Sequence, residues 1–207
     1  MEPWKGAAIG AMLLLIVGYG VVQNRPLQDG TAGADAVPGA KATETPDPTL
    51  TAWIGKEPLP WSFPAQSWVN TPRPLTPTDL KGKITLIEFW RRGCSHCEDA
   101  VPFMNTLKSH FGPKLQIITF QSPGVIDDPE NPENSWPQVK DWIKAHNIQY
   151  PVAFDEGRKL KNQYQVALYP FVMVVNRQGK IVYDHTGHTS EKARALGDEL
   201  QKLILEK

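Results

Sequence analysis

The sequence is poor in cysteine and has no surplus of charge of either sign. Only two cysteines, Cys94 and Cys97, occur in 207 residues. Two are too few for a disulfide scaffold or for a self-sufficient four-ligand zinc site. Lys plus Arg and Asp plus Glu both number 22, which argues against a nucleic-acid-binding protein and against a polyanionic one. With no internal repeat and no nucleotide or haem motif, we expect no organic cofactor, and the cysteine pair becomes the most informative feature.

One uncharged segment lies near the N-terminus. Residues 6–22 read GAAIGAMLLLIVGYGVV and reach the lower limit of length for a membrane-spanning helix. The run is longer than a typical signal-peptide core, and the candidate cleavage site Ala34-Asp35-Ala36 lies far beyond it. We therefore favour an N-terminal transmembrane helix within residues 1–23 over a cleaved signal peptide. Either interpretation exports the rest of the chain.

Residues 24–51 are rich in Gly, Ala, Pro and Thr and contain almost no large apolar side chains. Such a segment cannot offset the entropy of ordering by burial, so it predicts a flexible linker. The remaining residues, 52–207, predict one domain. Its first part is dense in Trp and Pro, and we expect these tryptophans to pack an irregular extension onto a sheet.

The domain predicts strands that alternate with helices. Apolar, β-rich runs indicate strands at 84–90, 115–120, 150–154, 171–175 and 180–183. Helical spacing indicates helices at 95–111, 135–146, 156–166 and from 190 onward, with Ser95 and Ser190 as expected N-caps. Residues 176–179 predict the turn of a hairpin between the last two strands. This order predicts an α/β fold with a central mixed β-sheet flanked by helices on both faces.

The two cysteines stand where a strand passes into a helix, in the sequence RRGCSHC. A Cys94 thiolate there would face unsatisfied backbone N–H groups and the positive end of the helix dipole, which lower a thiol pKa. Cys97, one turn into the helix, is placed to resolve a mixed disulfide. His96 adds a donor near the Cys94 sulfur, and Arg91 and Arg92 bring positive charge close in sequence.

Two further residues are candidates for the site. Glu88 stands in a strand otherwise made of apolar residues and Thr. It is either buried beneath the cysteines or on an edge strand facing water, and we favour burial. A buried Glu88 would have a raised pKa and could carry the proton of Cys97. Pro170 immediately precedes the strand 171–175. A proline at such a position commonly follows a cis peptide bond, so we expect the bond before Pro170 to be cis. Tyr169 stands directly before it.

Zinc is the main alternative for an isolated pair of cysteines. The sequence offers no second CxxC or HxxxH, and only His185 and His188 are plausible distant partners. Two histidines near a strand end are more often solvated surface residues than ligands. We therefore predict no metal site.

The strand, CxxC and helix, the proline before a β-hairpin, and Pro102 within the helix together resemble the thioredoxin superfamily. Residues from about 68 to 187 resemble most closely its TlpA/ResA-type and DipZ-type extracytoplasmic thiol-disulfide oxidoreductases. The resemblance implies a thioredoxin-like fold, with Cys94 as nucleophile and Cys97 as resolving thiol. It also implies that Pro170 is cis, lies beside the disulfide and contacts the substrate backbone. Tyr169, the second candidate substrate-binding residue, would add bulk beside the disulfide and restrict which substrates dock.

The resemblance favours a disulfide reductase of exported proteins, tethered at the membrane and recharged by a membrane-embedded electron donor, with a role in cytochrome c or metalloprotein maturation. Three departures bear on this. Gly93 replaces the usual large residue, the dipeptide between the cysteines is Ser95-His96, and Tyr169 is bulkier than usual. His96 and Glu88 are similar to features of DsbA-type oxidants, so disulfide formation is an alternative. A copper-binding chaperone using Cys94, Cys97 and a histidine such as His188 is another.

Overall fold

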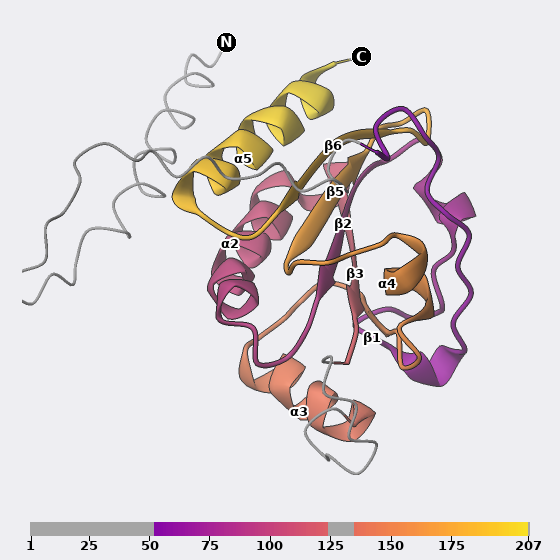
Figure 1. Ribbon diagram of the computed structural model, residues 1–207. Helices are drawn as coiled ribbons and strands as arrows, with labels where there is room; N and C mark the ends of the chain where they lie inside the picture. Colours follow the sequence, from indigo (N-terminus) through magenta and orange to yellow (C-terminus); the bar gives the residue numbers. More distant parts are fainter. Residues whose placement is uncertain (1–51, 124–134, 207) are drawn as a thin grey trace, which may run out of the picture. The chain divides into compact units, whose positions relative to one another are not determined.

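The computed structural model describes residues 52–123 and 135–206 (Figure 1). The predicted anchor at residues 1–23 and the predicted linker at 24–51 lie outside the described residues. The described part contains one sheet of six strands. They are β1 (Trp68–Val69), β2 (Ile84–Trp90), β3 (Leu115–Gln121), β4 (Val152–Phe154), β5 (Phe171–Val175) and β6 (Ile181–Thr186).

The sheet is mixed, in the spatial order β1-β4-β3-β2-β5-β6. Its centre is parallel, because β2 pairs with β3 and β3 with β4 through crossover helices. The two sides are antiparallel, with β1 on β4 at one edge and the β5–β6 hairpin next to β2 at the other. β2 therefore lies between two neighbours, and all seven of its residues are buried. The fold is thioredoxin-like, as predicted.

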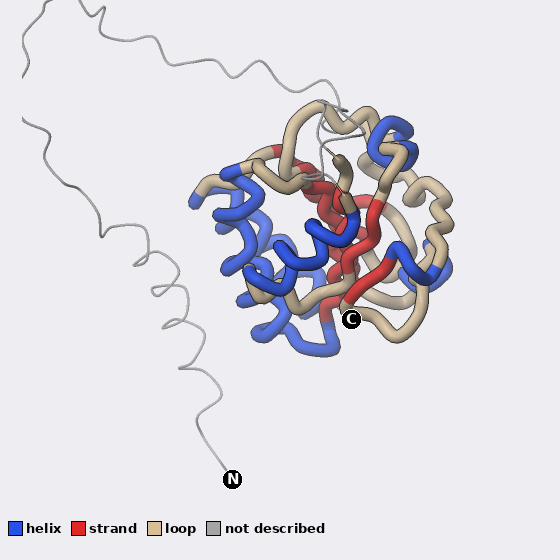
Figure 2. Tube along the Cα trace, turned by 90° about the horizontal axis from the view of Figure 1, so that it is seen from below, coloured by secondary structure: helices blue, strands red, loops and turns tan. Residues whose placement is uncertain are grey.

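Helices cover the sheet and produce two apolar cores. The helices are α2 (Ser95–Phe111), α3 (Trp136–Ala145), α4 (Lys159–Gln163) and α5 (Ser190–Leu205). α2 and α5 lie against one face of the sheet and α4 lies on the other (Figure 1). The tube view shows the strands as a layer between helices on one side and longer loops on the other (Figure 2).

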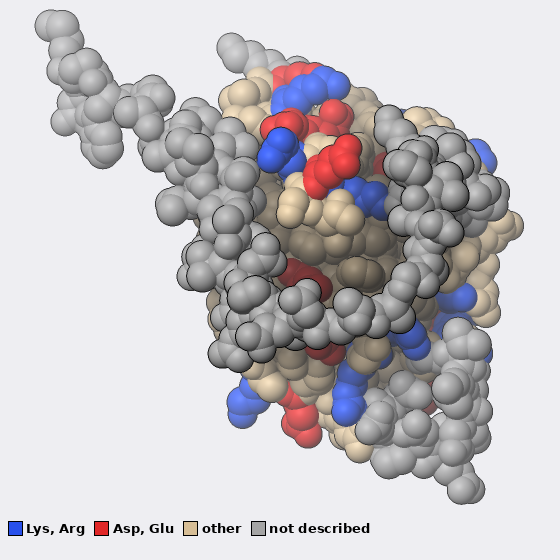
Figure 3. Space-filling model, turned by 60° about the vertical axis from the view of Figure 1, so that its left-hand side comes forward, with Lys and Arg blue, Asp and Glu red and all other residues tan. Residues whose placement is uncertain are grey.

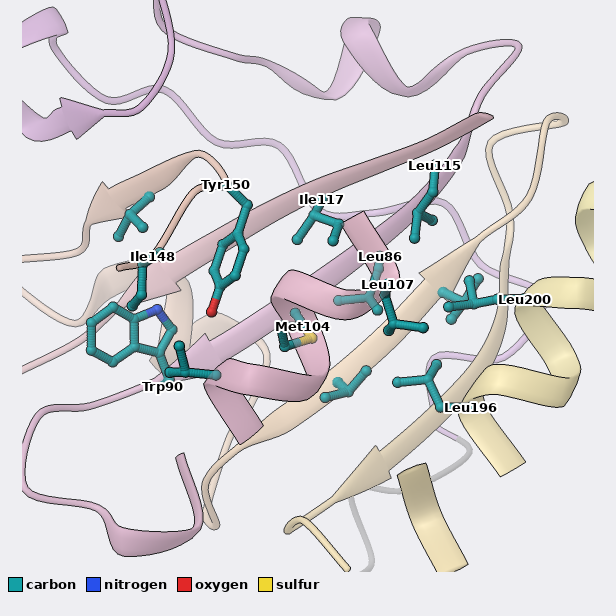
Figure 4. Packing of buried hydrophobic residues seen from close by; sticks show 14 of the residues in the cluster. Leu86, Trp90, Met104, Leu107, Leu115, Ile117, Ile148, Tyr150, Leu196 and Leu200 are labelled. Carbon is teal, nitrogen blue, oxygen red and sulfur yellow. The ribbon is translucent and has the colours of Figure 1, made fainter. Parts of the chain in front are cut away.

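The core beneath α2 is the one that reaches the cysteines. Leu86 and Ile117 on the sheet face Met104 and Leu107 of α2, and Leu196 of α5 closes the cluster farther along (Figure 4). Cys97 belongs to this cluster and is 3% exposed. Burial of large aliphatic side chains is worth roughly 1.5–3 kcal/mol each, so this core fixes the position of α2 on the sheet.

The second core confirms the expectation for the tryptophan-rich extension. Trp61 and Trp68 are both buried there, and each ring contacts Phe120 of β3 at an edge. The Trp61 indole N–H donates to the carbonyl oxygen of Leu75 at 2.9 Å. Trp68 opens β1, a two-residue strand that the sequence did not predict because it is too short to show alternation.

Several predicted boundaries were wrong. Cys94, not Ser95, is the N-cap of α2, and Thr189, not Ser190, caps α5 by accepting from the backbone N–H of Lys192. The helix predicted at 156–166 is confined to 159–163. It cannot begin before residue 159, because Arg158 adopts a left-handed conformation with φ 54°. β6 runs on to Thr186 because its pairing with β5 continues.

Within residues 52–123 and 135–206 no helix is both long enough and apolar enough to cross a membrane. Basic and acidic side chains lie interspersed on the described surface in Figure 3, as expected for a chain with a formal charge of zero.

Candidate active site

The candidate site lies where β2 passes into α2. Cys94 and Cys97 are joined in a disulfide. Cys94 is half-buried and caps α2, and its carbonyl oxygen accepts from the backbone N–H groups of Cys97 and Glu98, each at 3.0 Å. The N-terminus of an α-helix carries a partial positive charge, which stabilises a thiolate placed there.

The two sulfurs therefore have different surroundings. Cys97 lies inside the apolar core, whereas Cys94 lies at its border and remains accessible. An incoming disulfide or thiol reaches Cys94 first. A buried thiol in apolar surroundings stays protonated more readily than one at a helix terminus. This geometry supports the predicted order of attack.

Gly93 explains one departure from the resemblance. Its φ is +71°, a conformation that side chains other than glycine adopt at a cost. A large residue at this position would be strained, so the backbone of this turn requires the glycine. Of the two preceding arginines, Arg92 donates to the Gln138 side chain of α3 at 3.0 Å, and Arg91 lies near enough to Tyr169 for its charge to act on that hydroxyl.

Glu88 is buried, as predicted, at 3% exposure in the middle of β2. Because side chains alternate along a strand, it points to the same face as Leu86 and Trp90, which is the face covered by α2 and shared with Cys97. Burial raises the pKa of Glu88 from its usual 4.5 to about 8. At pH 7 only a minor fraction of the carboxyl is therefore ionised, and it is this carboxylate form that can accept a proton from a thiol on the same face of the sheet.

A small group of polar side chains surrounds this carboxyl, and the sequence did not single it out. Thr119 pairs with Glu88 across β2 and β3, and its hydroxyl accepts from the Trp90 indole N–H at 3.1 Å. Tyr150 is 1% exposed, and its pKa is raised well above 10.0 by burial and then by the negative charge of Glu88. Its hydroxyl points into the core towards Trp90 and Met104 (Figure 4). The tyrosine was missed because it reads as an ordinary core aromatic.

The Tyr169–Pro170 peptide bond is cis. Pro170 lies immediately before β5, whose first residue, Phe171, pairs with Phe89 of β2, so the cis bond stands at the same end of the sheet as the cysteines. Burial raises the pKa of Tyr169. Its hydroxyl lies beside Ser122 but makes no well-formed hydrogen bond among the described residues. Leu168, just upstream, is 57% exposed.

His185 and His188 differ from the expectation of a solvated pair. His185 is only 7% exposed, because β6 presents it to the face that α5 covers. Burial, with Lys192 and His188 as smaller causes, lowers the pKa of His185 to about 4. His188 is half-buried and His96 is exposed. In the part of the chain that the structure describes, no group of three His, Cys, Asp or Glu side chains is arranged to hold a metal ion.

Comparison with known proteins decides the family. The redoxin family model matches residues 47–200. The chain belongs to the redoxin family. Among curated redoxin relatives, the thiol-disulfide oxidoreductase ResA of Bacillus cereus is 31% identical over 126 residues, which are 60% of this chain and 66% of the relative. ResA of Bacillus subtilis is 30% identical over 114 residues, 55% of this chain and 59% of that protein. The match thus spans less than two thirds of these relatives.

Solved structures support the same redoxin fold. A thiol-disulfide isomerase from Corynebacterium glutamicum superposes with a TM-score of 0.61 at 23% identity, covering 72% of this chain and 98% of that one. At this identity the likeness establishes the thioredoxin-like fold alone. The ResA relatives support the TlpA/ResA-like resemblance, and the fold places the redoxin CxxC pair at the end of a central strand.

Proposed function

We propose that this redoxin is a thiol-disulfide oxidoreductase that reduces disulfides in exported proteins. The observation that carries the proposal is the Cys94–Cys97 disulfide at the N-terminus of α2, with one sulfur accessible and the other in the core. The ResA relatives, which are named for this activity, support it.

The reaction follows from the two environments. In the reduced enzyme the Cys94 thiolate attacks a substrate disulfide, the substrate S–S bond breaks, and a mixed disulfide forms. Cys97 then attacks the Cys94 sulfur and releases the substrate as a dithiol, while its own proton must leave the core. Glu88, on the same face of the sheet, accepts that proton in its carboxylate form, directly or through water, and the released substrate sulfurs take their protons from solvent. Tyr169 and the cis Pro170 flank the incoming substrate backbone.

A trapping experiment tests the assignment of the two thiols. In Cys97→Ala the mixed disulfide on Cys94 cannot be resolved, so we expect a covalent adduct with a protein substrate that mass spectrometry identifies. Cys94→Ala is the matched control and should trap nothing. Adducts formed equally by Cys94→Ala would contradict the assigned order of attack. The adducts also test whether apocytochromes or metalloproteins are substrates.

A disulfide-forming oxidant is the second candidate, because Cys94 caps a helix and His96 lies in the first turn next to it. Both features stabilise a thiolate and so favour the reduced enzyme. Equilibration with glutathione separates the two activities. A midpoint potential above roughly −150 mV would identify an oxidant, since strong oxidants of this fold lie near about −120 mV and thioredoxin near about −270 mV.

The proposal includes a membrane tether and a membrane-embedded electron donor. The tether is supported by the 17 uncharged residues from 6 to 22 in the sequence. We expect the full chain to fractionate with membranes, with the domain from residue 52 onward exposed on the outer side, and a chain without residues 1–23 to be released. An intact mass that matches a chain beginning after residue 36 would identify a cleaved signal peptide instead.

A further inference from the structure

His188 lies in the turn between β6 and α5, beside the first turns of α2. Its ring centroid is 5.7 Å from that of Phe103, and the charges of Asp99 and His96 both act on its imidazole. His96, Asp99 and Phe103 are three and four residues apart, so they form one stripe along α2. His188 therefore covers the stripe that begins between the two cysteines.

The strand order and one backbone hydrogen bond hold this turn at the end of the sheet where the cysteines lie. β5 lies between β2 and β6, so the end of β6 and the end of β2 are two strands apart. The backbone N–H of Gly187 donates to the carbonyl oxygen of Pro170 at 2.7 Å. His188 is thereby joined to the cis-proline segment on one side and to the CxxC helix on the other.

Burial favours a neutral His188 in the oxidised protein. Burial lowers its pKa below 6.5, the negative charge of Asp99 opposes that shift, and His96 adds to it. Two further basic residues belong to the same region, Lys192 and His185. The Lys192 ammonium group donates to the Thr186 carbonyl oxygen at 2.7 Å, and His185 stays neutral near pH 7. A new negative charge near His188 would therefore find a neutral imidazole able to accept a proton.

We propose that His188 is a second active-site histidine, which takes up one of the two protons that accompany reduction of the Cys94–Cys97 disulfide. This inference rests on the proposed thiol-disulfide exchange. A dithiol donor supplies two electrons and two protons, its own disulfide forms, and the enzyme S–S bond breaks. One proton stays on the Cys97 thiol and the other goes to His188, so that the Cys94 thiolate and the imidazolium carry opposite charges. Asp99 supplies a second negative charge beside the imidazolium.

The direct test is the titration of the His188 ring, followed by NMR in the oxidised and the reduced protein. We expect its pKa to rise on reduction by about one unit, the lower end of the effect of a close opposite charge. In Cys94→Ser, which has no thiolate, His188 should titrate as in the oxidised form. His110, at the far end of α2, is the internal control and should titrate alike in both forms. An unchanged His188 titration on reduction would overturn the proposal.

An equilibrium measurement gives a second, independent readout. We compare the exchange constant with dithiothreitol between pH 6 and 7 in wild type and in His188→Gln, with His110→Gln as the matched control. Without a proton acceptor, formation of the Cys94 thiolate releases a proton, so the constant for enzyme reduction should rise tenfold per pH unit in H188Q and clearly less in wild type and H110Q. Equal slopes would refute the proposal. Normal proton coupling in a protein that fails to reduce disulfides would instead refute the proposed function alone.

Discussion

Replacement of Glu88 by Gln tests the electrostatics beneath the disulfide most directly. The side chain is 3% exposed, and burial raises its pKa from 4.5 to about 8. The folded protein therefore holds the carboxyl neutral at pH values where the unfolded chain has already released the proton. Ionisation of the unfolded state then lowers the free energy of unfolding as the pH rises from about 4.5 to about 8. Gln has nearly the same shape and no such ionisation.

The magnitude follows from the two pKa values. Each unit of difference is worth about 1.4 kcal/mol, so wild type should lose about 3 kcal/mol of stability between pH 4 and pH 7 through Glu88 alone. Glu88→Gln should lack this loss. Its stability relative to wild type should thus rise by about 3 kcal/mol over the same interval, a large share of the total for a domain of this size. Any constant cost of burying the amide does not alter this pH dependence.

Urea denaturation of the oxidised proteins at several pH values measures the effect. The oxidised form is used because its two cysteines are joined in a disulfide and have no thiol to titrate. The contribution of His185 is common to both proteins and cancels in the difference. Glu156→Gln, at an exposed position after β4, serves as the control and should leave the pH dependence unchanged. If wild type and E88Q lose stability in parallel, the carboxyl is not held neutral by burial, and its assigned role in proton transfer fails with it.

Three further substitutions test local structure by their effect on the free energy of unfolding. Thr189→Ala should cost about 1 kcal/mol by removing the N-cap of α5, whereas Ser190→Ala should cost clearly less; equal costs would contradict the assigned cap. Trp61→Ala should cost about 3–5 kcal/mol, because the ring is 7% exposed in the second core, and a loss near zero would show that the extension is not part of that core. Tyr164→Phe should cost about 1–3 kcal/mol, since its hydroxyl accepts from the Leu59 backbone N–H at 2.7 Å; an unchanged midpoint would show that water replaces this bond.

The sequence predicted the centre of this fold well, because its signals there are local. The run from Ile84 to Trp90 is long and apolar, and the strand has the predicted bounds. The turn from Asn176 to Gly179 is also as expected, with the Asn176 side chain accepting from the backbone N–H groups of Gln178 and Lys180. The burial of Glu88 followed from alternation along a strand whose neighbours are apolar.

The missed features depend on contacts between residues distant in the chain. β1 is held by its pairing with β4, more than 80 residues later, and two residues carry no periodic signal. His185 was expected at the surface because its own sequence neighbourhood is polar, and its burial comes from α5 lying over the end of β6. The two N-caps differ by one residue from the prediction. At each helix start the observed cap, Cys94 or Thr189, directly precedes the serine that was expected, and helix ends are where boundary prediction is weakest.

The direction of electron flow depends on the balance between the two sulfurs. At Cys94, the helix terminus and His96 stabilise the thiolate, and a stabilised thiolate makes the reduced form more stable and the enzyme more oxidising. At Cys97, the core favours a neutral thiol, and Glu88 is the one acidic side chain buried on the same face, among the residues that the structure describes, to receive its proton. If His188 takes up a proton on reduction, it adds to the stabilisation at Cys94. Loss of His188 should therefore make the enzyme more reducing, whereas loss of Glu88 should slow resolution, so the two variants separate equilibrium from rate at one site.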